Sequence, residues 1–478
     1  MNPYQPIELS GLPSAEQLQK ALLDGENSEA RTRLALLFDR DTFVETGVYT
    51  KRAFSDFVST EDGDGLEGVI TGYGAIDGKP VFAFAQDATR MEGMIDERHA
   101  MKIERLYALA LKNGAPVIGI FDATGTDVFS GAAGLAAYGR ILAAVHSASG
   151  KIPQIALISG SCIGLSAAIA ALFDFPVKEK DAELYVSSPD LIKTKNATDM
   201  ILTYQGDKVS CAGFIRTLIS FLPINAAIGT VVGTSTDKFD RMLGNIDLGG
   251  DGQTAIAAIA DSGVYYAVSE GFAPVAVTAF ATVAGIRCGV VATSHATGDG
   301  RLTAAAAKKI ARFVRFCDAF SLPVITLVDS DGLTMDSENE NAFFAPELAR
   351  LGSAYCAARS PKVTVLLGHA VGAPFVLLGS KALGADIVYA LDSTEVCVLP
   401  AEAGVAFAWE RLITPEKTKE VLIDEWRASV SSPVYAASSG EIDDVIPVSE
   451  LRARICSALL MLCCKGTSLN NGRTILPL

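Results

Sequence analysis

Two short turns of small residues are the features of this sequence that could do chemistry. The first turn, residues 159–165 (SGSCIGL), follows an apolar run of strand length. The alanine-rich segment after it predicts a helix that begins at the carboxyl end of a buried strand. The first N–H groups of such a helix lack partners within the helix and carry a partial positive charge. They could bind a phosphate or a carboxylate, or stabilise a developing enolate oxygen.

The same arrangement occurs a second time. Residues 309–332 repeat the pattern of residues 102–125 at a distance of 207, and both read as a helix, a proline step, an apolar strand and an aspartate. Residues 361–372 repeat residues 153–164 at a distance of 208 and contain most of the second turn, residues 367–373. The matching glycines are Gly160 with Gly368 and Gly164 with Gly372. This order and spacing predict a domain duplication in which each half supplies one strand-to-helix turn.

The composition indicates a cytoplasmic α/β protein. The 478 residues are 49% hydrophobic and include 43 glycines, which is typical of tightly packed α/β layers. A net charge of −15 argues against nucleic acid and anionic membranes as partners. Nine cysteines without a CxxC pair, in a chain that shows no secretory signal, indicate reduced thiols in the cytosol. The four histidines lack metal-ligand spacing, so we expect no metal.

Alternating strands and helices predict a parallel-rich sheet in each of two domains, residues 1–250 and 251–478. Asp77 and Gly78 between two apolar runs predict a hairpin in the first domain, and residues 275–293 predict its counterpart. Ligands of such sheets bind beyond the carboxyl ends of the strands, where both turns lie. After residue 414 the pattern predicts only a polar helix, residues 415–428, and a tail.

Local signals place the helices and the strand ends. Asp96 is a candidate N-cap of a helix that ends near Gly114, and Thr303 begins the corresponding helix of the second half. Asp122 and Asp329 end their strands at matching positions. We expect these two carboxylates to cap turns, while an acid–base role stays open.

Common catalytic motifs are absent. The sequence has neither a Walker-type GxxxxGK[ST] nor a hydrolase GxSxG. What remains is a chemistry that needs few side chains, because backbone N–H groups alone can stabilise an oxyanion. Two such sites facing one cleft would suit transfer of a carboxyl group between an enolisable thioester and a cyclic urea, which develops one enolate on each partner.

The sequence resembles the carboxyltransferase (beta-type) subunits of biotin-dependent acyl-CoA carboxylases, transcarboxylases and acyl-CoA decarboxylases. The resemblance covers residues 66–405, and its most specific carriers are residues 309–320 (KIARFVRFCDAF) and 379–386 (GSKALGAD). It implies an α/β fold of two crotonase-like (ClpP/crotonase) ββα superhelix domains per chain. It also implies a homo-oligomer, a dimer or a hexamer, whose working site forms between subunits.

The resemblance also implies the substrates and partners. A short acyl-CoA, such as acetyl-, propionyl-, malonyl- or methylmalonyl-CoA, would bind mainly to the N-terminal half, and biotin to the C-terminal half. The sequence lacks the family's carrier lysine between two methionines and any ATP site. Biotin would therefore sit on a separate carrier protein, and a biotin carboxylase or a membrane decarboxylase pump subunit would complete the reaction.

The resemblance places the two oxyanion motifs at residues 162–166 and 371–375. The residues expected to act through their backbone are Ile163, Gly164, Leu165, Gly372 and Ala373. The residues expected to bind coenzyme A or biotin are Gly125, Thr126, Ser161, Cys162, Gly332 and Val371.

Several positions depart from the family pattern. Leu165 and Ala373 stand where the family has the second of two glycines, and Pro374 lacks an N–H. Asp127 stands where the family has an arginine. These departures leave open a catalytically weakened paralogue that binds acyl-CoA or scaffolds a complex. A crotonase-type hydratase or lyase is a third possibility, disfavoured because no glutamate lies in residues 119–135 or 159–171.

Overall fold

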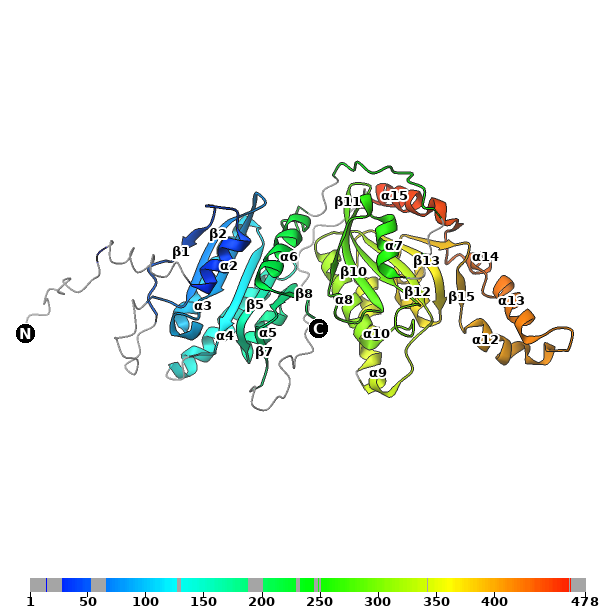
Figure 1. Cartoon of the computed structure of the whole chain (residues 1–478), viewed down its shortest axis with the longest axis horizontal. Helices are drawn as coiled ribbons and strands as arrows, with labels where there is room; N and C mark the ends of the chain where they lie inside the picture. Colours follow the sequence, from blue (N-terminus) through cyan, green and yellow to red (C-terminus); the bar gives the residue numbers. More distant parts are fainter. Residues whose placement is uncertain are drawn as a thin grey trace, which may run out of the picture. The chain divides into compact units, whose positions relative to one another are not determined.

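The computed structural model describes residues 14, 28–52, 66–126, 130–187, 201–228, 233–244, 248, 251–341, 343–463 and 465. The chain divides into two compact units (Figure 1). The first comprises Met1–Ala148, Gln154–Asp199 and Gln205–Ser220, and the second Ser149–Pro153, Met200–Tyr204 and Phe221–Leu478. The last segment of the second unit therefore begins before residue 250, and the predicted domain boundary there stays a prediction. Among the described residues, no helix is long and apolar enough to span a bilayer.

The first unit is built on a sheet with strand order β1-β2-β3-β4-β5-β6-β8, and β7 also pairs with β5. β2 is antiparallel to β1 and β3, whereas β3, β4, β5 and β6 are parallel. The strands are β1 Val44–Thr46, β2 Val69–Ile76, β3 Lys79–Gln86, β4 Val117–Ala123, β5 Gln154–Ile163, β6 Phe175–Glu179, β7 Glu183–Tyr185 and β8 Tyr204–Gly206. The helices are α2 Glu29–Leu37, α3 Glu97–Asn113, α4 Gly131–Ala148, α5 Leu165–Ala171 and α6 Lys208–Phe221.

The second unit is built on a sheet with strand order β16-β14-β13-β12-β11-β10-β9, and β15 also pairs with β13. Helices α7 and α15 share one apolar core with these strands, while α8 packs on β10, β11 and α10. The strands are β9 Tyr265–Val268, β10 Ala276–Val283, β11 Ile286–Thr293, β12 Val324–Ser330, β13 Lys362–Val371, β14 Ile387–Leu391, β15 Glu395–Cys397 and β16 Asp444–Ile446. The helices are α7 Gly252–Ile259, α8 Ala304–Ala319, α9 Ser337–Asn341, α10 Phe344–Ala357, α11 Ala373–Leu377, α12 Ala401–Gly404, α13 Lys419–Ser429, α14 Pro433–Ala437 and α15 Leu451–Leu462.

The two sheets confirm the predicted duplication. Within the described residues each has eight strands, and they correspond one to one in order, with β7 and β15 as the additional partners of β5 and β13. The register also repeats, since Ala123 pairs with Cys162 in the first unit and Ser330 pairs with Ala370 in the second. Sequence positions 207 or 208 apart are thus structurally equivalent in this part of the sheets.

Local sequence signals explain the hairpins and the helix ends. Asp77 and Gly78 have φ of 48° and 73°, which is the left-handed conformation that a tight hairpin requires. The Asp96 side chain accepts from the N–H groups that begin α3, and Gly114 ends this helix in the left-handed conformation. Thr303 caps α8 by accepting from the Ala306 N–H. These predictions are confirmed.

In each unit, an aspartate at the end of one strand accepts a hydrogen bond from the next strand, β4 to β5 in the first unit and β12 to β13 in the second. Asp122 Oδ1 accepts from the Ser161 N–H at 3.2 Å, and Asp329 Oδ1 accepts from the His369 N–H at 2.7 Å. Both aspartates thus cap the strand ends, as predicted. Each carboxylate occupies the space that a side chain on the neighbouring glycine would need. This contact explains why both turns contain a glycine four residues before the one at the start of the helix.

Gly160→Ala and Gly368→Ala test this packing. The new Cβ would lie 1.9 Å from Asp122 Oδ1 in the first variant and 2.6 Å from Asp329 Oδ1 in the second, so each carboxylate would have to move. We expect each variant to lose about 1–3 kcal/mol of unfolding free energy, measured by urea denaturation. Gly139→Ala is the control, because a Cβ there meets nothing within 4 Å, and it should gain up to about 1 kcal/mol. Equal stability of all three variants would contradict the assignment.

A buried lysine ties the hairpin to the first long helix in each unit. Lys102 on α3 donates to the Val69 carbonyl, and Lys309 on α8 donates to the Ala276 carbonyl at 2.7 Å. Lys102 is 5% exposed and Lys309 is 3% exposed. Burial lowers the pKa of each ammonium group to about 8. The second unit therefore repeats the first even at a position where burying a charged ammonium group costs stability.

Lys102→Met and Lys309→Met test the effect of these charges. An unfolded lysine has a pKa of about 10.4, so between about pH 8 and 10 the unfolded chain binds more protons than the folded chain. The wild-type lysines should therefore make the unfolding free energy rise with pH in this window, by at most roughly 1.4 kcal/mol per pH unit each. We expect the unfolding free energy of each variant to rise less than that of the wild type between about pH 7.5 and about pH 9.5. Urea denaturation at both pH values measures the difference. Exposed Lys112 on α3 gives the control, Lys112→Met, which should keep the wild-type slope.

Candidate functional site

The first turn is shorter than predicted, because β5 continues through Ile163 and Gly164 alone joins it to α5. This glycine has φ 62° and ψ −123°, a conformation that residues with side chains rarely adopt. Its N–H donates to the Tyr185 carbonyl at 2.9 Å, and its carbonyl accepts from the Ala168 N–H. The first amides without an acceptor inside the helix are therefore those of Leu165 and the residues just after it.

The second turn has nearly the same backbone. Gly372 has φ 63° and ψ −132°, and its N–H donates to the Cys397 carbonyl at 2.8 Å. Helix α11 begins at Ala373, and Pro374 supplies no N–H. The amides that remain at this helix start are those of Ala373 and Phe375.

The predicted catalytic residues thus lie at the two helix starts, but their backbone N–H groups are not equally available. Ile163 is the last residue of β5 and pairs with Tyr185 on β7. The N–H groups of Gly164 and Gly372 hold the turns to neighbouring strands and are not available to a ligand. The first N–H groups that could serve a ligand are those of Leu165 and Ala373, one residue later, and the glycines set the conformation of the turns.

The predicted ligand-binding residues of the first unit surround the ends of β4 and β5. Gly125 has φ 149°, and a Cβ at Gly125 or Gly164 would meet nothing within 4 Å, so the backbone is open to approach at both. Thr126 Oγ1 donates to the Ile95 carbonyl at 2.6 Å. The Cys162 side chain is fully buried, and burial raises the pKa of its thiol well above the ordinary value, so only its backbone could contact a ligand. Asp127 lies outside the described residues.

The predicted ligand-binding residues of the second unit lie together. A Cβ on Gly332, whose φ is 117°, would be 3.9 Å from the Val371 carbonyl oxygen. Val371 itself is buried and precedes the glycine of the second turn. The structure therefore brings Gly332, Val371, Gly372 and Ala373 to one place.

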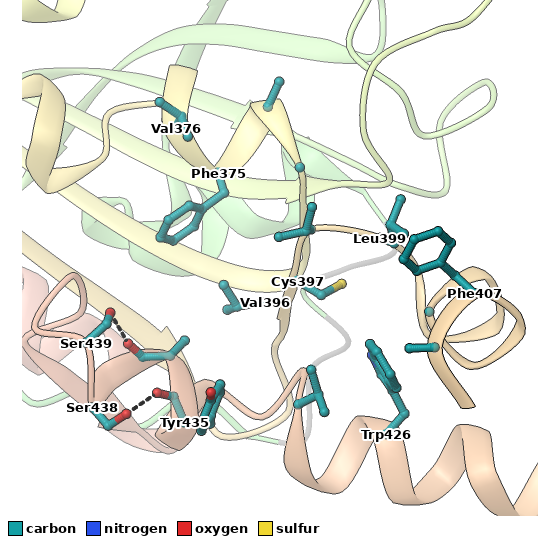
Figure 2. Close-up of a pocket in the computed structure, with 17 residues that line it drawn as sticks. Phe375, Val376, Val396, Cys397, Leu399, Phe407, Trp426, Tyr435, Ser438 and Ser439 are labelled. Atoms are coloured by element: carbon teal, nitrogen blue, oxygen red, sulfur yellow. Dashed lines mark hydrogen bonds between the residues drawn. The ribbon is translucent and has the colours of Figure 1, made fainter. Parts of the chain in front are cut away.

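A cavity of about 950 Å³ opens beside the second turn (Figure 2). Figure 2 shows Phe375 and Val396 on one side and Phe407 and Trp426 on the other, on helices near the end of the chain. The lining is mainly apolar, and its residues are Gly372, Ala373, Phe375, Val376, Val396, Cys397, Val398, Leu399, Gly404, Phe407, Ala408, Trp426, Val430, Tyr435, Ala436, Ser438 and Ser439. The hydroxyls of Ser438 and Ser439 donate to carbonyls of their own helix end.

Sequence reasoning missed the part of this cavity that residues 396–439 form. A signal was present, because both tryptophans of the chain, Trp409 and Trp426, lie in this stretch. Their rings pack edge to face with centroids 4.9 Å apart. Among the described residues, no group of three or more histidine, cysteine, aspartate or glutamate side chains is placed to hold a metal ion.

Comparison with known proteins identifies the family. The model of the carboxyl transferase domain matches residues 25–206 and 200–471. The methylmalonyl-CoA decarboxylase subunit alpha of Veillonella parvula is 34% identical over 462 residues, which cover 91% of this chain and 90% of that protein. The propionyl-CoA carboxylase beta chain of Roseobacter denitrificans is 33% identical over 460 residues, covering 91% of this chain and 90% of that protein.

The fold also matches a solved structure. The crystal structure of transcarboxylase 12S, with methylmalonyl-coenzyme A and methylmalonic acid bound, superposes with a TM-score of 0.85 at 30% identity. The match covers 96% of this chain and 94% of that one. The predicted duplicated crotonase-like α/β fold is thereby confirmed. On the family match and on the likeness to these relatives over nearly its whole length, the chain belongs to the carboxyl transferase domain family of enzymes.

Proposed function

We propose that the chain is the carboxyltransferase subunit of a biotin-dependent acyl-CoA carboxylase or decarboxylase. It moves a carboxyl group between biotin on a separate carrier protein and a short acyl-CoA of the methylmalonyl/propionyl or malonyl/acetyl type. Family membership and the names of the relatives, which act on methylmalonyl-CoA and propionyl-CoA, support this reaction. The observation that carries the proposal is the pair of turns, each of which ends in a helix start whose first backbone amides have no acceptor within the helix.

The first turn is the proposed acyl-CoA side. The Leu165 amide and the amides after it would stabilise the enolate oxygen that a thioester develops when its carboxyl group leaves. The open space around Gly125 and Gly164 allows the thioester to approach the backbone. Arg33 steadies this turn, because its guanidinium pairs with Glu179 at 2.8 Å and donates to the Ser159 carbonyl at 3.2 Å.

The second turn is the proposed biotin side. An apolar cavity of about 950 Å³ whose lining includes Ala373 fits a bicyclic urea, which has an apolar body and one strong acceptor oxygen. Bound there, biotin would supply the ureido nitrogen that carries the carboxyl group. The residues of this chain that would hold it are Ala373, Phe375 and the apolar side chains of the cavity wall.

The other features of the proposal follow from the relatives. The transcarboxylase 12S structure is a hexamer, and we propose that this chain also forms a homo-oligomer, a dimer or a hexamer. We place the reaction in the cytoplasm, with the biotin carrier on another chain. The weakened-paralogue alternative is not favoured, because both turns keep the positive-φ glycine and the helix start that the chemistry requires.

Decarboxylation of malonyl-CoA or methylmalonyl-CoA tests the reaction. Mixed with free biotin and one of these thioesters, the purified chain should convert malonyl-CoA to acetyl-CoA or methylmalonyl-CoA to propionyl-CoA without ATP. Chromatography of the thioesters measures the conversion. Conversion should depend on biotin, since biotin accepts the carboxyl group. Tight binding of the thioester without conversion would instead support the scaffold alternative.

Leu165→Pro tests the first-turn amide. Proline is tolerated at the first position of a helix but has no N–H, so one oxyanion donor is removed with little change of fold. We expect kcat for thioester decarboxylation to fall by about 100- to 1,000-fold. Leu165→Ala shortens the exposed side chain but keeps the N–H, and should retain most of the rate. Similar rates for both variants would show that this amide is not a donor.

A further inference from the structure

Two histidine–aspartate pairs lie against each other at the ends of β11, β12 and β13. His295 Nδ1 is 2.6 Å from Asp329 Oδ2, and His369 Nδ1 is 2.5 Å from Asp331 Oδ1. The imidazole rings stack with centroids 4.6 Å apart and an interplanar angle of 17°. Each pair joins residues more than thirty positions apart in the sequence, 34 and 38 respectively.

The carboxylates determine how each ring can act. An ionised carboxylate can only accept a hydrogen bond, so the Nδ1 of each ring carries the hydrogen. Each neutral ring then has its lone pair at Nε2. This is the arrangement in which an aspartate orients a histidine that takes up and returns a proton at Nε2. Both imidazole side chains are 36% exposed, so they are accessible.

The two pairs have different surroundings. Asp329 is fully buried and also accepts the backbone N–H groups of His295 and His369, so its pair with His295 holds the strand ends together. The side chain of Asp331 is 33% exposed, and its carboxylate pairs with His369. The second pair is therefore the one that is placed to serve a ligand.

The pair of His369 and Asp331 lies beside the second turn. His369 is on β13 three residues before Gly372, and Asp331 is next to Gly332. Burial raises the pKa of Cys397, a residue of the cavity wall, and the negative charge of Asp331 raises it further. Gly332, next to Asp331, lies beside the Val371 carbonyl, and Val371 pairs with Cys397 of the cavity wall, so the second pair lies near the cavity.

The first unit provides an internal comparison. The positions equivalent to His295, Asp331 and His369, which lie 207 or 208 residues earlier, are Ala88, Thr124 and Ser161. The first unit forms the same turn around Asp122 without any imidazole. The fold therefore does not require the histidines, and their presence in the second unit alone indicates a function there.

We propose that His369, oriented by Asp331, is the proton-transfer residue of the second turn, a role that rests on carboxyl transfer as the proposed function. Nε2 takes the proton of the urea N–H, and the electron pair of that bond forms the new N–C bond to the carboxyl carbon. The C–C bond of the thioester breaks, and its electron pair stays on the acyl carbon. The acyl carbon then takes up one proton, which balances the proton that the urea lost. The exchange therefore needs no oxidant or reductant.

Other charged groups near the ring affect its charge. Asp329 and His295 face it from the ends of β12 and β11, and Glu395 on β15 pairs with His369 in the sheet. Arg427 offsets Glu395 through an ion pair at 3.0 Å. These carboxylates would stabilise the positive charge that the ring gains when it takes the proton of the urea.

The pH dependence of the reaction tests the proposal. Biotin-dependent decarboxylation of malonyl-CoA by the wild-type oligomer should slow towards acid pH, because an imidazole that already carries a proton at Nε2 cannot accept another. His369→Gln should lose about 100- to 10,000-fold in rate and lose this pH dependence. Asp331→Asn should lose at least about tenfold, since the ring is no longer held in its tautomer. Exposed His146 on α4 gives the control, His146→Gln, which should match the wild type.

A second measurement does not depend on turnover. Diethyl pyrocarbonate acylates neutral imidazole, and peptide mass spectrometry follows each of the four histidines separately. Free biotin should slow the modification of His369 and leave His146 unaffected. Thermal unfolding of His369→Gln near the wild-type midpoint would exclude loss of fold as the cause of a lower rate.

The outcomes separate the two proposals. If the wild type does not turn over, the proposed function fails and the proton-transfer role fails with it. If the wild type turns over while His369→Gln keeps the wild-type rate and pH profile, only the role of His369 is overturned. Protection of His369 by biotin without loss of rate in the variant would also overturn it, because the ring would then be a contact and not a proton carrier.

Discussion

Each half of this protein depends on a carboxylate that accepts a hydrogen bond from the backbone of the next strand and fills the space beside a glycine there. Asp122 and Asp329 occupy the space beside Gly160 and Gly368 and accept a backbone N–H of β5 or β13. The contact anchors β5 and β13 two residues before they end, just ahead of the turn and helix that follow. Backbone donors that are fixed before a reaction starts need no reorganisation during it, which is the condition for oxyanion stabilisation.

The two halves share this scaffold and differ in what surrounds the turns. Around the first turn, the backbone is open at Gly125 and Gly164, and the equivalents of the histidine pair are small and neutral. Around the second, an apolar cavity and two histidine–aspartate pairs lie close to Gly372. A duplicated backbone has thus acquired two chemical environments, which suits a reaction between two different partners.

Signals that act over a few residues could be read from the sequence. The Asp77–Gly78 hairpin, the helix starts at Asp96 and Thr303 and the helix end at Gly114 all formed where predicted, because each depends on neighbours in the chain. The duplication also located both turns. The cavity could not be predicted, because its wall includes residues 396–439, where the pattern indicated only a polar helix.

The sequence by itself determined the family, the duplicated α/β fold and the positions of Gly164 and Gly372, because these follow from local chemistry and from repeated spacing. Only the tertiary structure decided which amides remain available, since the partners of the two glycines, Tyr185 and Cys397, lie on strands that reach them through sheet pairing. It also decided that distant histidines and aspartates meet. Pairing between strands sets these distances, and the spacing of residues along the chain does not reveal it.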